Sequence, residues 1–270
     1  MRLARLADGR LARQDGERFQ PLDFEGDVAD LIRAGIAPGD LGIAEYMASE
    51  GSLQAPVRPG KIVAIGLNYL DHCREANMDP PERPLVFTKW TSSIVGPSDD
   101  IVVDRELTDA VDWEVELGVV IGQRMKDVPA TKALNYVFGY TVANDVSARD
   151  VQTADGQWVR AKSMDTFCPL GPVVVTADEV PDPQALRIWT KVNGETMQEA
   201  DTSLMVFGVA ELLSFCSRNF PLEPGDLVIT GTPWGVGFVR QPPIGLRDGD
   251  LVEAGVDGIG VLANRVRDAA

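Results

Sequence analysis

The stretch that decides the fold is VDWEVELGVVIG, residues 111–122. Its apolar and β-branched residues predict the strongest strand of the chain. Alternate residues of a strand share a face, so Glu114 and Glu116 should project together, about 6.5–7 Å apart at about 3.3 Å per residue. The second half of the stretch is apolar on both faces, which predicts a strand entering the protein interior, where unpaired carboxylates are costly. The alternative is an amphipathic strand whose acidic face lies in water.

Predicted strands recur along the rest of the chain, and predicted helices are few. The clearest helix is expected over residues 203–219, where apolar residues recur at helical spacing. The strands do not alternate regularly with helices, which argues against a Rossmann fold or a TIM barrel and favours a β-rich α+β fold. The other predicted strands cover residues 61–69, 85–90, 93–97, 169–176, 186–194, 226–231, 251–256 and 258–266, and a segment that ends at 145.

Two domains are expected. Residues 1–57 should form a small N-terminal α+β domain, with a hairpin that turns at Asp8-Gly9 and a short helix in VADLIRAG. Residues 48–60 are a polar connector rich in Pro and Gly. Residues 58–270 should form the larger domain.

Composition narrows the class of partner. The chain has 270 residues, with 41 Asp and Glu against 25 Lys and Arg, which gives a net charge of −16 at pH 7. Binding to nucleic acid or to an anionic membrane surface needs a basic face, so the acidic balance argues against both. A small anionic substrate would need local positive charge, and a bound cation is the obvious source.

The sequence shows no sign of membrane insertion or secretion. It has no run of 18 apolar residues, and its N-terminus lacks the apolar core of a secretory signal. The three cysteines, Cys73, Cys168 and Cys216, have no CxxC spacing, so neither a disulfide framework nor a thiolate zinc site is predicted. We therefore expect reduced thiols and a cytoplasmic location.

The chain has one histidine, His72, which excludes mechanisms that need two imidazoles, such as HExxH zinc hydrolysis. Glu75 follows three residues later, and on a helical turn the two side chains would be neighbours. Glu75 could then orient the imidazole and hold its proton, so that His72 activates a water as a general base. The alternative is a surface histidine beside an acid.

A third acid, Asp145, ends the apolar segment TVAND. Three carboxylates without an imidazole form a site of hard oxygen ligands. Such a site suits Mg²⁺ or Mn²⁺, with Ca²⁺ as an alternative, and does not suit zinc or copper. Asp145 could instead be a helix N-cap or a turn residue.

Two further features are less specific. Lys162 stands in a chain with 6 lysines against 19 arginines, so it is a candidate for a compact point charge. Residues 229–237 form a turn rich in Gly and Thr, whose hydroxyl and N–H groups could face an anion. The alternatives are an ordinary surface lysine and a bare turn.

Taken together, the motifs resemble the fumarylacetoacetate hydrolase superfamily from about residue 61 to the C-terminus. The resemblance lies in GLNYLDHCRE, PLVFTKW, DWEVELGVVIG, GYTVANDVSARDVQ, AKSMDTFCPLGP and PGDLVITGTPWGVG, in the family's order. It implies a catalytic domain with a mixed β-roll, a single divalent metal and a homodimer. It also implies that the substrate is a small 2-oxo or β-diketo acid.

The resemblance assigns roles to individual residues. The implied metal ligands are Glu114, Glu116 and Asp145. The implied catalytic residues are His72, Glu75 and Lys162, and the implied substrate contacts are Gln152, Thr232, Lys89 and Tyr69. The family's namesake has a fourth carboxylate ligand shortly before its histidine, where this chain reads IGLN over residues 65–68. A water is expected in that position, which argues against fumarylacetoacetate as the substrate.

We therefore expect a C–C bond hydrolase of the acylpyruvase type or an oxaloacetate decarboxylase. In this hypothesis the metal chelates the carboxylate and 2-oxo oxygens and stabilises the enolate that forms as a C–C bond breaks. In a hydrolase, His72 would activate the attacking water and Lys162 would stabilise the oxyanion, whereas a decarboxylase needs no water. The polar stretch 71–84 is expected to act as a lid.

Two other functions stay open. One is isomerisation or hydration of an unsaturated 2-oxo dicarboxylic acid in aromatic catabolism, which would use the metal and the base without cleaving carbon. The other is a non-catalytic β-protein that binds Ca²⁺. Turnover of oxaloacetate or acetylpyruvate with Mg²⁺ or Mn²⁺ would favour an enzyme, and tight Ca²⁺ binding without turnover would favour the binder.

Overall fold

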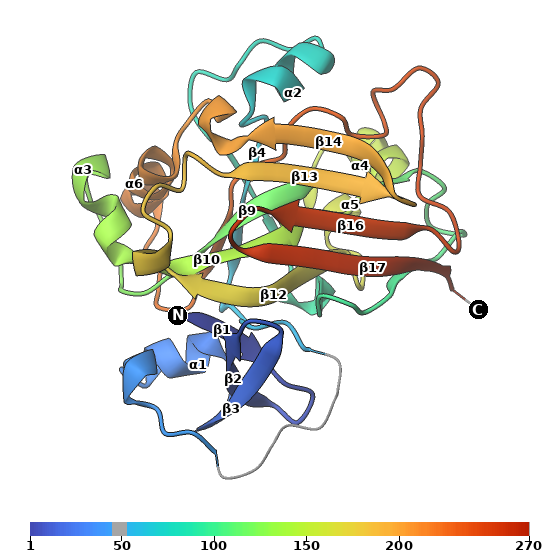
Figure 1. Cartoon of the computed structure of the whole chain (residues 1–270). Coiled ribbons are helices and arrows are strands. Elements are labelled where there is room, and N and C mark those ends of the chain that lie inside the picture. The colour runs from blue at the N-terminus through green and yellow to red at the C-terminus, as the bar shows by residue number, and fades with distance from the viewer. Residues whose placement is uncertain (45–52, 270) are drawn as a thin grey trace.

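The computed structural model describes residues 1–44 and 53–269, in which strands dominate and helices are short (Figure 1). The strands are β1 Arg2–Arg5, β2 Arg10–Asp15, β3 Arg18–Glu25, β4 Ile62–Gly66, β5 Leu85–Lys89, β6 Ile94–Val95, β7 Ile101–Val103, β8 Val111–Asp112, β9 Val115–Ile121, β10 Val137–Asn144, β11 Ser147–Ala148, β12 Cys168–Thr176, β13 Arg187–Val192, β14 Glu195–Asp201, β15 Leu227–Ile229, β16 Leu251–Val256 and β17 Gly260–Asp268. The α-helices are α1 Val28–Arg33, α2 Leu70–Glu75, α3 Ala130–Ala133, α4 Arg149–Asp155, α5 Val159–Lys162 and α6 Val209–Asn219. Short 3₁₀ helices cover Pro38–Asp40, Thr91–Ser93, Leu134–Tyr136, Ala177–Glu179 and Thr202–Leu204.

Two large sheets form the layers of the molecule. The first has ten strands in the order β3-β2-β1-β12-β10-β9-β15-β4-β5, with β6 paired to β12. The second has five strands in the order β14-β13-β16-β17-β7, and Figure 1 shows it in front of β9, β10 and β12. Buried residues of both sheets and of α6, such as Leu117, Ile188 and Leu213, belong to one hydrophobic cluster. The expected β-rich α+β fold is confirmed.

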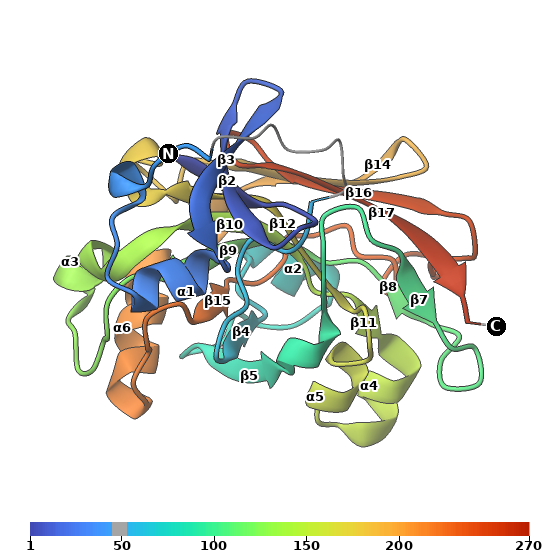
Figure 2. The ribbon, with the colours of Figure 1, turned by 90° about the horizontal axis from the view of Figure 1, so that it is seen from below.

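The N-terminal strands are continuous with the larger sheet. β1 pairs antiparallel with β12, with Leu3 opposite Val174. Figure 1 and Figure 2 both show α1 beside β2 and β3. The chain turns between β1 and β2 at the predicted hairpin, where Gly9 has a φ of +90°. Helix α1 is capped by Asp27, whose side chain accepts the N–H groups of Ala29 and Asp30. Of the predicted connector, residues 48–52 lie outside the described residues.

The strand predicted over residues 111–122 is interrupted. β8 pairs with β11 in a small separate sheet, and β9 pairs with β10 and β15 in the large one. Between them, backbone N–H groups bond to side chains instead of to a neighbouring strand. The Glu114 N–H donates to Asn144 Oδ1 at 3.0 Å, and the Val115 N–H donates to Gln198 Oε1 at 3.2 Å. The break places Glu114 outside regular strand geometry.

The helix predicted over residues 203–219 is shorter than expected. Only Val209–Asn219 is α-helical, and a 3₁₀ turn precedes it. The side chain of Asn68 accepts the Phe207 N–H at 3.0 Å and donates to the Phe207 carbonyl at 3.1 Å, which occupies the backbone groups that a longer helix would need. Gly208 is extended, and its N–H donates to Glu211 Oε2 at 3.0 Å.

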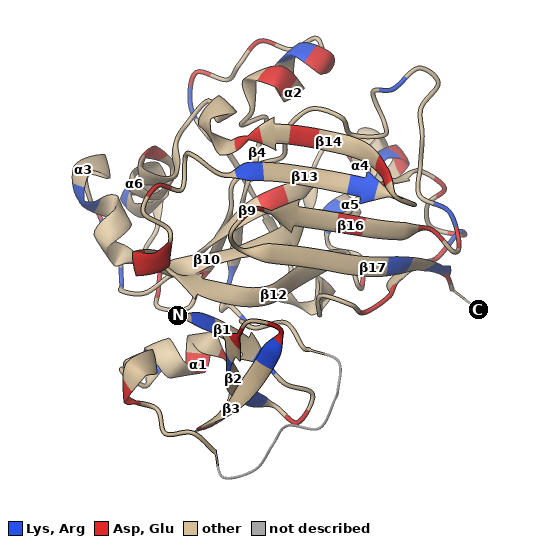
Figure 3. Cartoon of the chain, viewed as in Figure 1, with Lys and Arg blue, Asp and Glu red and all other residues tan. Residues whose placement is uncertain are grey.

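Charged residues of both signs are distributed over the fold. Figure 3 shows Lys and Arg positions as well as Asp and Glu positions on strands, helices and loops. Within residues 1–44 and 53–269, no helix has the length and apolar character needed to cross a membrane.

The close pairing of β10 with β12 gives a prediction for stability. A Cβ at Gly139 would lie 2.2 Å from the Val175 carbonyl oxygen, so Gly139→Ala must force two central strands apart. We expect the free energy of unfolding to fall by about 1–3 kcal/mol, measured by urea denaturation. Gly39→Ala is the control, because a Cβ there would meet nothing within 4 Å. Equal midpoints for the two variants would contradict this account.

Candidate active site

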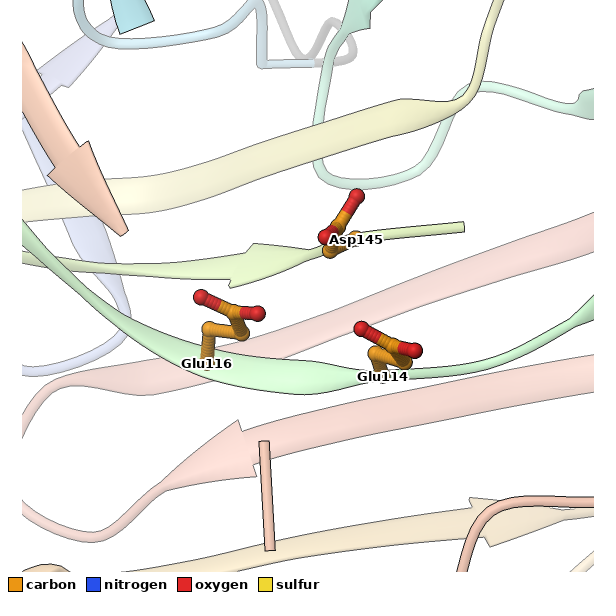
Figure 4. A group of neighbouring side chains, drawn as sticks. All are labelled: Glu114, Glu116 and Asp145. Atoms are coloured by element: carbon orange, nitrogen blue, oxygen red, sulfur yellow. The ribbon is translucent and has the colours of Figure 1, made fainter. Parts of the chain in front are cut away.

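Three buried carboxylates meet where β8, β9 and β10 come together. Glu116 lies in β9, Glu114 just before it, and Asp145 directly after β10. β9 and β10 are antiparallel neighbours with Glu116 opposite Ala143, and the Asp145 N–H donates to the Glu114 carbonyl at 2.8 Å. One carboxylate oxygen from each residue therefore lies within 4.8 Å of the others. Figure 4 shows Glu114 and Glu116 rising from the same side of their strand toward Asp145.

Two buried lysines neutralise part of this charge. Lys162 Nζ donates to Glu114 Oε2 at 2.8 Å, to Asp145 Oδ2 at 2.7 Å and to Ser147 Oγ at 2.7 Å. These acceptors occupy all three of its N–H groups. Lys89 Nζ donates to Asp145 Oδ1 at 2.6 Å and to two backbone carbonyls. Asp145 is thus held between two ammonium groups.

The third cation at the triad is Arg149, the first residue of α4. Its Nη2 lies 2.6 Å from Glu114 Oε1 and 2.9 Å from Asp112 Oδ2, and its Nη1 donates to Gln152 Oε1 at 3.0 Å. Arg149 was not predicted as a site residue. Its spacing of three residues from Gln152, within a predicted functional motif, is the signal that could have identified it.

The charges act differently on the ionisable groups of the site. Burial opposes ionisation of Glu114, but the charges of Lys162 and Arg149 outweigh it and lower the pKa of Glu114 to about 2. Burial, reinforced by the charges of Asp145 and Glu114, raises the pKa of Glu116 well above its usual range. Burial also opposes the charge of Lys162, but the two carboxylates outweigh it and raise the pKa of Lys162.

The donor set fits a hard divalent cation. Glu114 and Asp145 have cationic partners, whereas Glu116 takes part in no ion pair of the described residues and accepts one hydrogen bond, from the Gly231 N–H at 2.7 Å. A cation beside Glu116 would offset the repulsion that raises its pKa. Three carboxylates suit Mg²⁺ or Mn²⁺, with Ca²⁺ as the alternative. Glu114, Glu116 and Asp145 are the residues that would hold it.

A cavity of about 320 Å³ opens beside the carboxylates. Its polar lining includes Glu114 of the triad, the other predicted site residues His72, Gln152, Lys162 and Thr232, and two residues that were not predicted, Arg149 and Thr153. The rest of the lining is apolar, and its aromatic part comprises Phe87, Trp158 and Phe238. Phe87 and Trp158 meet edge to face with ring centroids 5.3 Å apart. No sequence motif singled out this aromatic wall.

His72 faces the cavity from helix α2, which also carries Glu75. His72 Nδ1 lies 2.7 Å from Glu75 Oε1, so Nε2 is the ring nitrogen left for the cavity. Glu75 is fixed in turn, because its Oε2 accepts the Gly235 N–H at 2.9 Å. The imidazole is therefore held from behind, with one nitrogen toward the space beside the triad.

The four predicted substrate contacts divide into two pairs. Gln152 and Thr232 line the cavity. Lys89 and Tyr69 are fully buried and do not belong to the lining. Lys89 supports Asp145 from behind, and the hydroxyl of Tyr69 has no hydrogen-bond partner among the described residues. Neither residue lines the cavity, and their role as substrate contacts stays a prediction.

The raised pKa of Glu116 predicts proton release on metal binding. Burial and the neighbouring carboxylates favour the protonated form of Glu116, but a metal ligand must be ionised. Mn²⁺ binding should therefore release protons, and Mn²⁺ affinity should fall as the pH is lowered. Calorimetric titration in two buffers of different ionisation enthalpy measures this release.

The control for this experiment is Glu195→Gln, which removes an exposed carboxylate on β14. It should release the same number of protons as the wild type. Glu116→Gln should lose both the proton release and most of the Mn²⁺ affinity. Unchanged affinity in Glu116→Gln would show that the cation binds elsewhere.

The chain is similar to several known proteins. It is 51% identical to the mitochondrial oxaloacetate tautomerase FAHD2A of Bos taurus over 221 residues, which are 81% of this chain and 70% of the relative. A fumarylacetoacetate hydrolase from Exiguobacterium antarcticum superimposes with a TM-score of 0.89 at 36% identity, over the whole of both chains. A 5-carboxymethyl-2-hydroxymuconate delta-isomerase from Mycobacterium smegmatis superimposes with a TM-score of 0.82 at 37% identity, also over both whole chains.

The family model that matches is the fumarylacetoacetate hydrolase C-terminal domain, over residues 61–267. This range contains the three carboxylates, both lysines and the His72–Glu75 pair, and it agrees with the superfamily resemblance seen in the motifs. The chain belongs to the fumarylacetoacetate hydrolase family.

Proposed function

We propose that this chain is a divalent-metal-dependent enzyme that moves a proton at the carbon next to the carbonyl of a small 2-oxo acid, and so interconverts its keto and enol forms. Oxaloacetate is the first substrate to test, because a relative with about half of its aligned residues identical is named an oxaloacetate tautomerase. The observation that carries the proposal is the imidazole of His72, which lines the same cavity as Glu114, one of the three clustered carboxylates.

Each group of the site has a separate role in this reaction. A divalent cation on the triad would polarise the 2-oxo group and so acidify the neighbouring C–H bond. His72 Nε2 takes the proton from that carbon, while Glu75 on Nδ1 stabilises the charged imidazolium. Return of the proton to oxygen or to carbon completes the interconversion. Gln152 and Thr232 offer polar groups to the substrate's oxygens.

Lys162 bears on the choice between tautomerisation and hydrolysis. Hydrolysis of a C–C bond needs a donor for the oxyanion that forms at the attacked carbonyl. All three N–H groups of Lys162 are already bound to Glu114, Asp145 and Ser147. This occupation favours reactions without a second oxyanion, and it supports a role for Lys162 in holding the carboxylates in place.

Cleavage of a C–C bond is the second candidate. Decarboxylation of oxaloacetate requires neither an attacking water nor an oxyanion donor, so the bound state of Lys162 is compatible with it. Hydrolysis of an acylpyruvate would need Lys162 to leave one of its acceptors. Isomerisation of an unsaturated 2-oxo acid needs the same proton transfer as tautomerisation, and one structural neighbour is named a 5-carboxymethyl-2-hydroxymuconate delta-isomerase.

Substitution of His72 separates these reactions. His72→Ala should lower the rate of keto–enol interconversion by about 10²–10⁴-fold, the usual range for a lost general base. Decarboxylation should suffer less, because no proton leaves carbon before the C–C bond breaks. Both are followed on oxaloacetate with saturating Mn²⁺, the first by the ultraviolet absorbance of the enol and the second by release of CO₂.

Glu75→Gln is the matched variant, because it can keep the contact to His72 Nδ1 but removes the negative charge. It should lose less activity than His72→Ala. Equal losses of both reactions in His72→Ala would mean that His72 acts in substrate binding or closure of the cavity, and the assignment as base would be abandoned.

We also propose a homodimer in a reducing, cytoplasm-like compartment. Large apolar side chains are exposed, among them Trp90 at 58% and Leu107 at 57%, and the three cysteines are free and buried. A two-fold interface should bury well over about 1,000 Å². Light scattering at micromolar concentration should give twice the mass of one chain, and the mass of a single chain would contradict the dimer. The named bovine relative is mitochondrial, so the compartment stays a proposal.

A further inference from the structure

Asp112, the last residue of β8, lies at the break in the predicted strand and is 1% exposed. It does not line the cavity beside the triad. Its Oδ1 accepts the N–H groups of Trp113 at 2.9 Å and Gly237 at 2.7 Å. Its Oδ2 accepts the Phe238 N–H at 3.1 Å and Arg149 Nε at 2.9 Å. Each carboxylate oxygen therefore accepts two hydrogen bonds. Each also connects Asp112 to residues at the cavity, either directly or through the backbone.

One arm of Asp112 reaches the metal side of the cavity. The guanidinium of Arg149 lies between Asp112 Oδ2 and Glu114 Oε1, at 2.9 Å and 2.6 Å from Nη2. Asp112 fixes the plane of the guanidinium through Nε. The positive charge of Arg149 is then shared between Asp112 and Glu114. Without that sharing, Arg149 would pull more strongly on Glu114, and a cation would have to compete for the same carboxylate.

The second connection of Asp112 runs to the His72–Glu75 pair, through the backbone turn at residues 235–238. Asp112 holds the Gly237 and Phe238 end of this turn, and Trp113 Nε1 donates to the Gly235 carbonyl at 3.2 Å. The Gly235 N–H holds Glu75, and Glu75 holds His72. The turn has little freedom to move. A Cβ at Gly235 would lie 2.1 Å from the Met197 carbonyl oxygen, and one at Gly237 would lie 2.1 Å from that of Ile244.

We propose that Asp112 is a positioning residue that fixes the candidate metal ligands and the His72–Glu75 pair relative to each other; the role rests on the proposed function. A carboxylate is needed because four N–H donors converge on its two oxygens, one of them from the ion-paired Arg149. An amide of the same shape must turn its NH₂ group toward donors, so either the turn or Arg149 loses its acceptor.

The first test is Mn²⁺ affinity of the metal-free protein, measured by the electron paramagnetic resonance signal of free Mn²⁺. Asp112→Asn should weaken Mn²⁺ binding by about tenfold or more, the lower end of losses from residues that orient metal ligands. Asp150→Asn is the control. This variant removes one charge at the start of α4, where the Asp150 carboxylate accepts hydrogen bonds from the Thr108 hydroxyl and the Asp109 N–H. Its Mn²⁺ affinity should stay within about twofold of the wild-type value.

The second test is a double-variant cycle at saturating Mn²⁺. Asp112→Asn should lower kcat by about 10–100-fold with a smaller change in KM. Because Asp112→Asn and Glu75→Gln both misplace the imidazole of His72, their combined loss of kcat should be clearly smaller than the product of the single losses. If Asp112→Asn does not fold, Trp113→Phe removes the bond to the Gly235 carbonyl together with part of a buried ring, but leaves the Asp112 contacts to Arg149 in place. It should lower kcat without changing Mn²⁺ affinity.

Wild-type Mn²⁺ affinity in Asp112→Asn would overturn the metal arm, and losses that multiply in the cycle would overturn the base arm. An unchanged kcat in Trp113→Phe would overturn the base arm as well. If the wild type converts no 2-oxo acid, the proposed function fails, while the Mn²⁺ comparison still decides whether Asp112 positions the carboxylates.

Discussion

Repulsion among Glu114, Glu116 and Asp145 is the constraint that the rest of the site satisfies. Two unit charges 4 Å apart repel by about 4 kcal/mol at the effective dielectric of a protein, and more when water is excluded. The structure responds with Lys162, Lys89 and Arg149, all buried and all paired to these carboxylates or to a neighbour. The repulsion that these cations do not offset acts on Glu116. Its pKa is raised, and it takes part in no ion pair of the described residues. The site is thus prepared for one more positive charge.

The fold supplies this arrangement by combining rigid and irregular parts. β9 and β10 lie inside the ten-stranded sheet, so Glu116 and Asp145 are fixed by strand register. Glu114 stands where regular pairing stops, which lets its side chain meet Arg149 from α4 and Lys162 from α5. His72 is carried by another element, α2, and lines the same cavity as Glu114. Carboxylates and base are therefore carried by separate elements whose relative position depends on the contacts between them.

Much of this could be read from the sequence, and the failures have physical causes. Alternation in VDWEVEL indicated that Glu114 and Glu116 share a direction, and the spacing of His72 and Glu75 indicated a helical pair; both arrangements are present. The break after Asp112 could not be read, because it depends on acceptors such as Asn144 and Gln198 that lie far away in the sequence. The start of α6 was misjudged because Asn68, from another part of the chain, occupies the backbone of Phe207. Local pattern fixes which residues share a face, but tertiary hydrogen bonds fix where an element begins and ends.

The turn at residues 235–238 has a consequence for how the protein can be altered. Its contacts to Glu75 and Asp112 are made by main-chain N–H groups, which are the same for every residue type except proline. Replacing Val236 or Phe238 would change the surface of the cavity while leaving those N–H groups in place. A library that varies these two positions could therefore reshape substrate preference without touching the support of the base, whereas variation at the flanking glycines would disturb both at once.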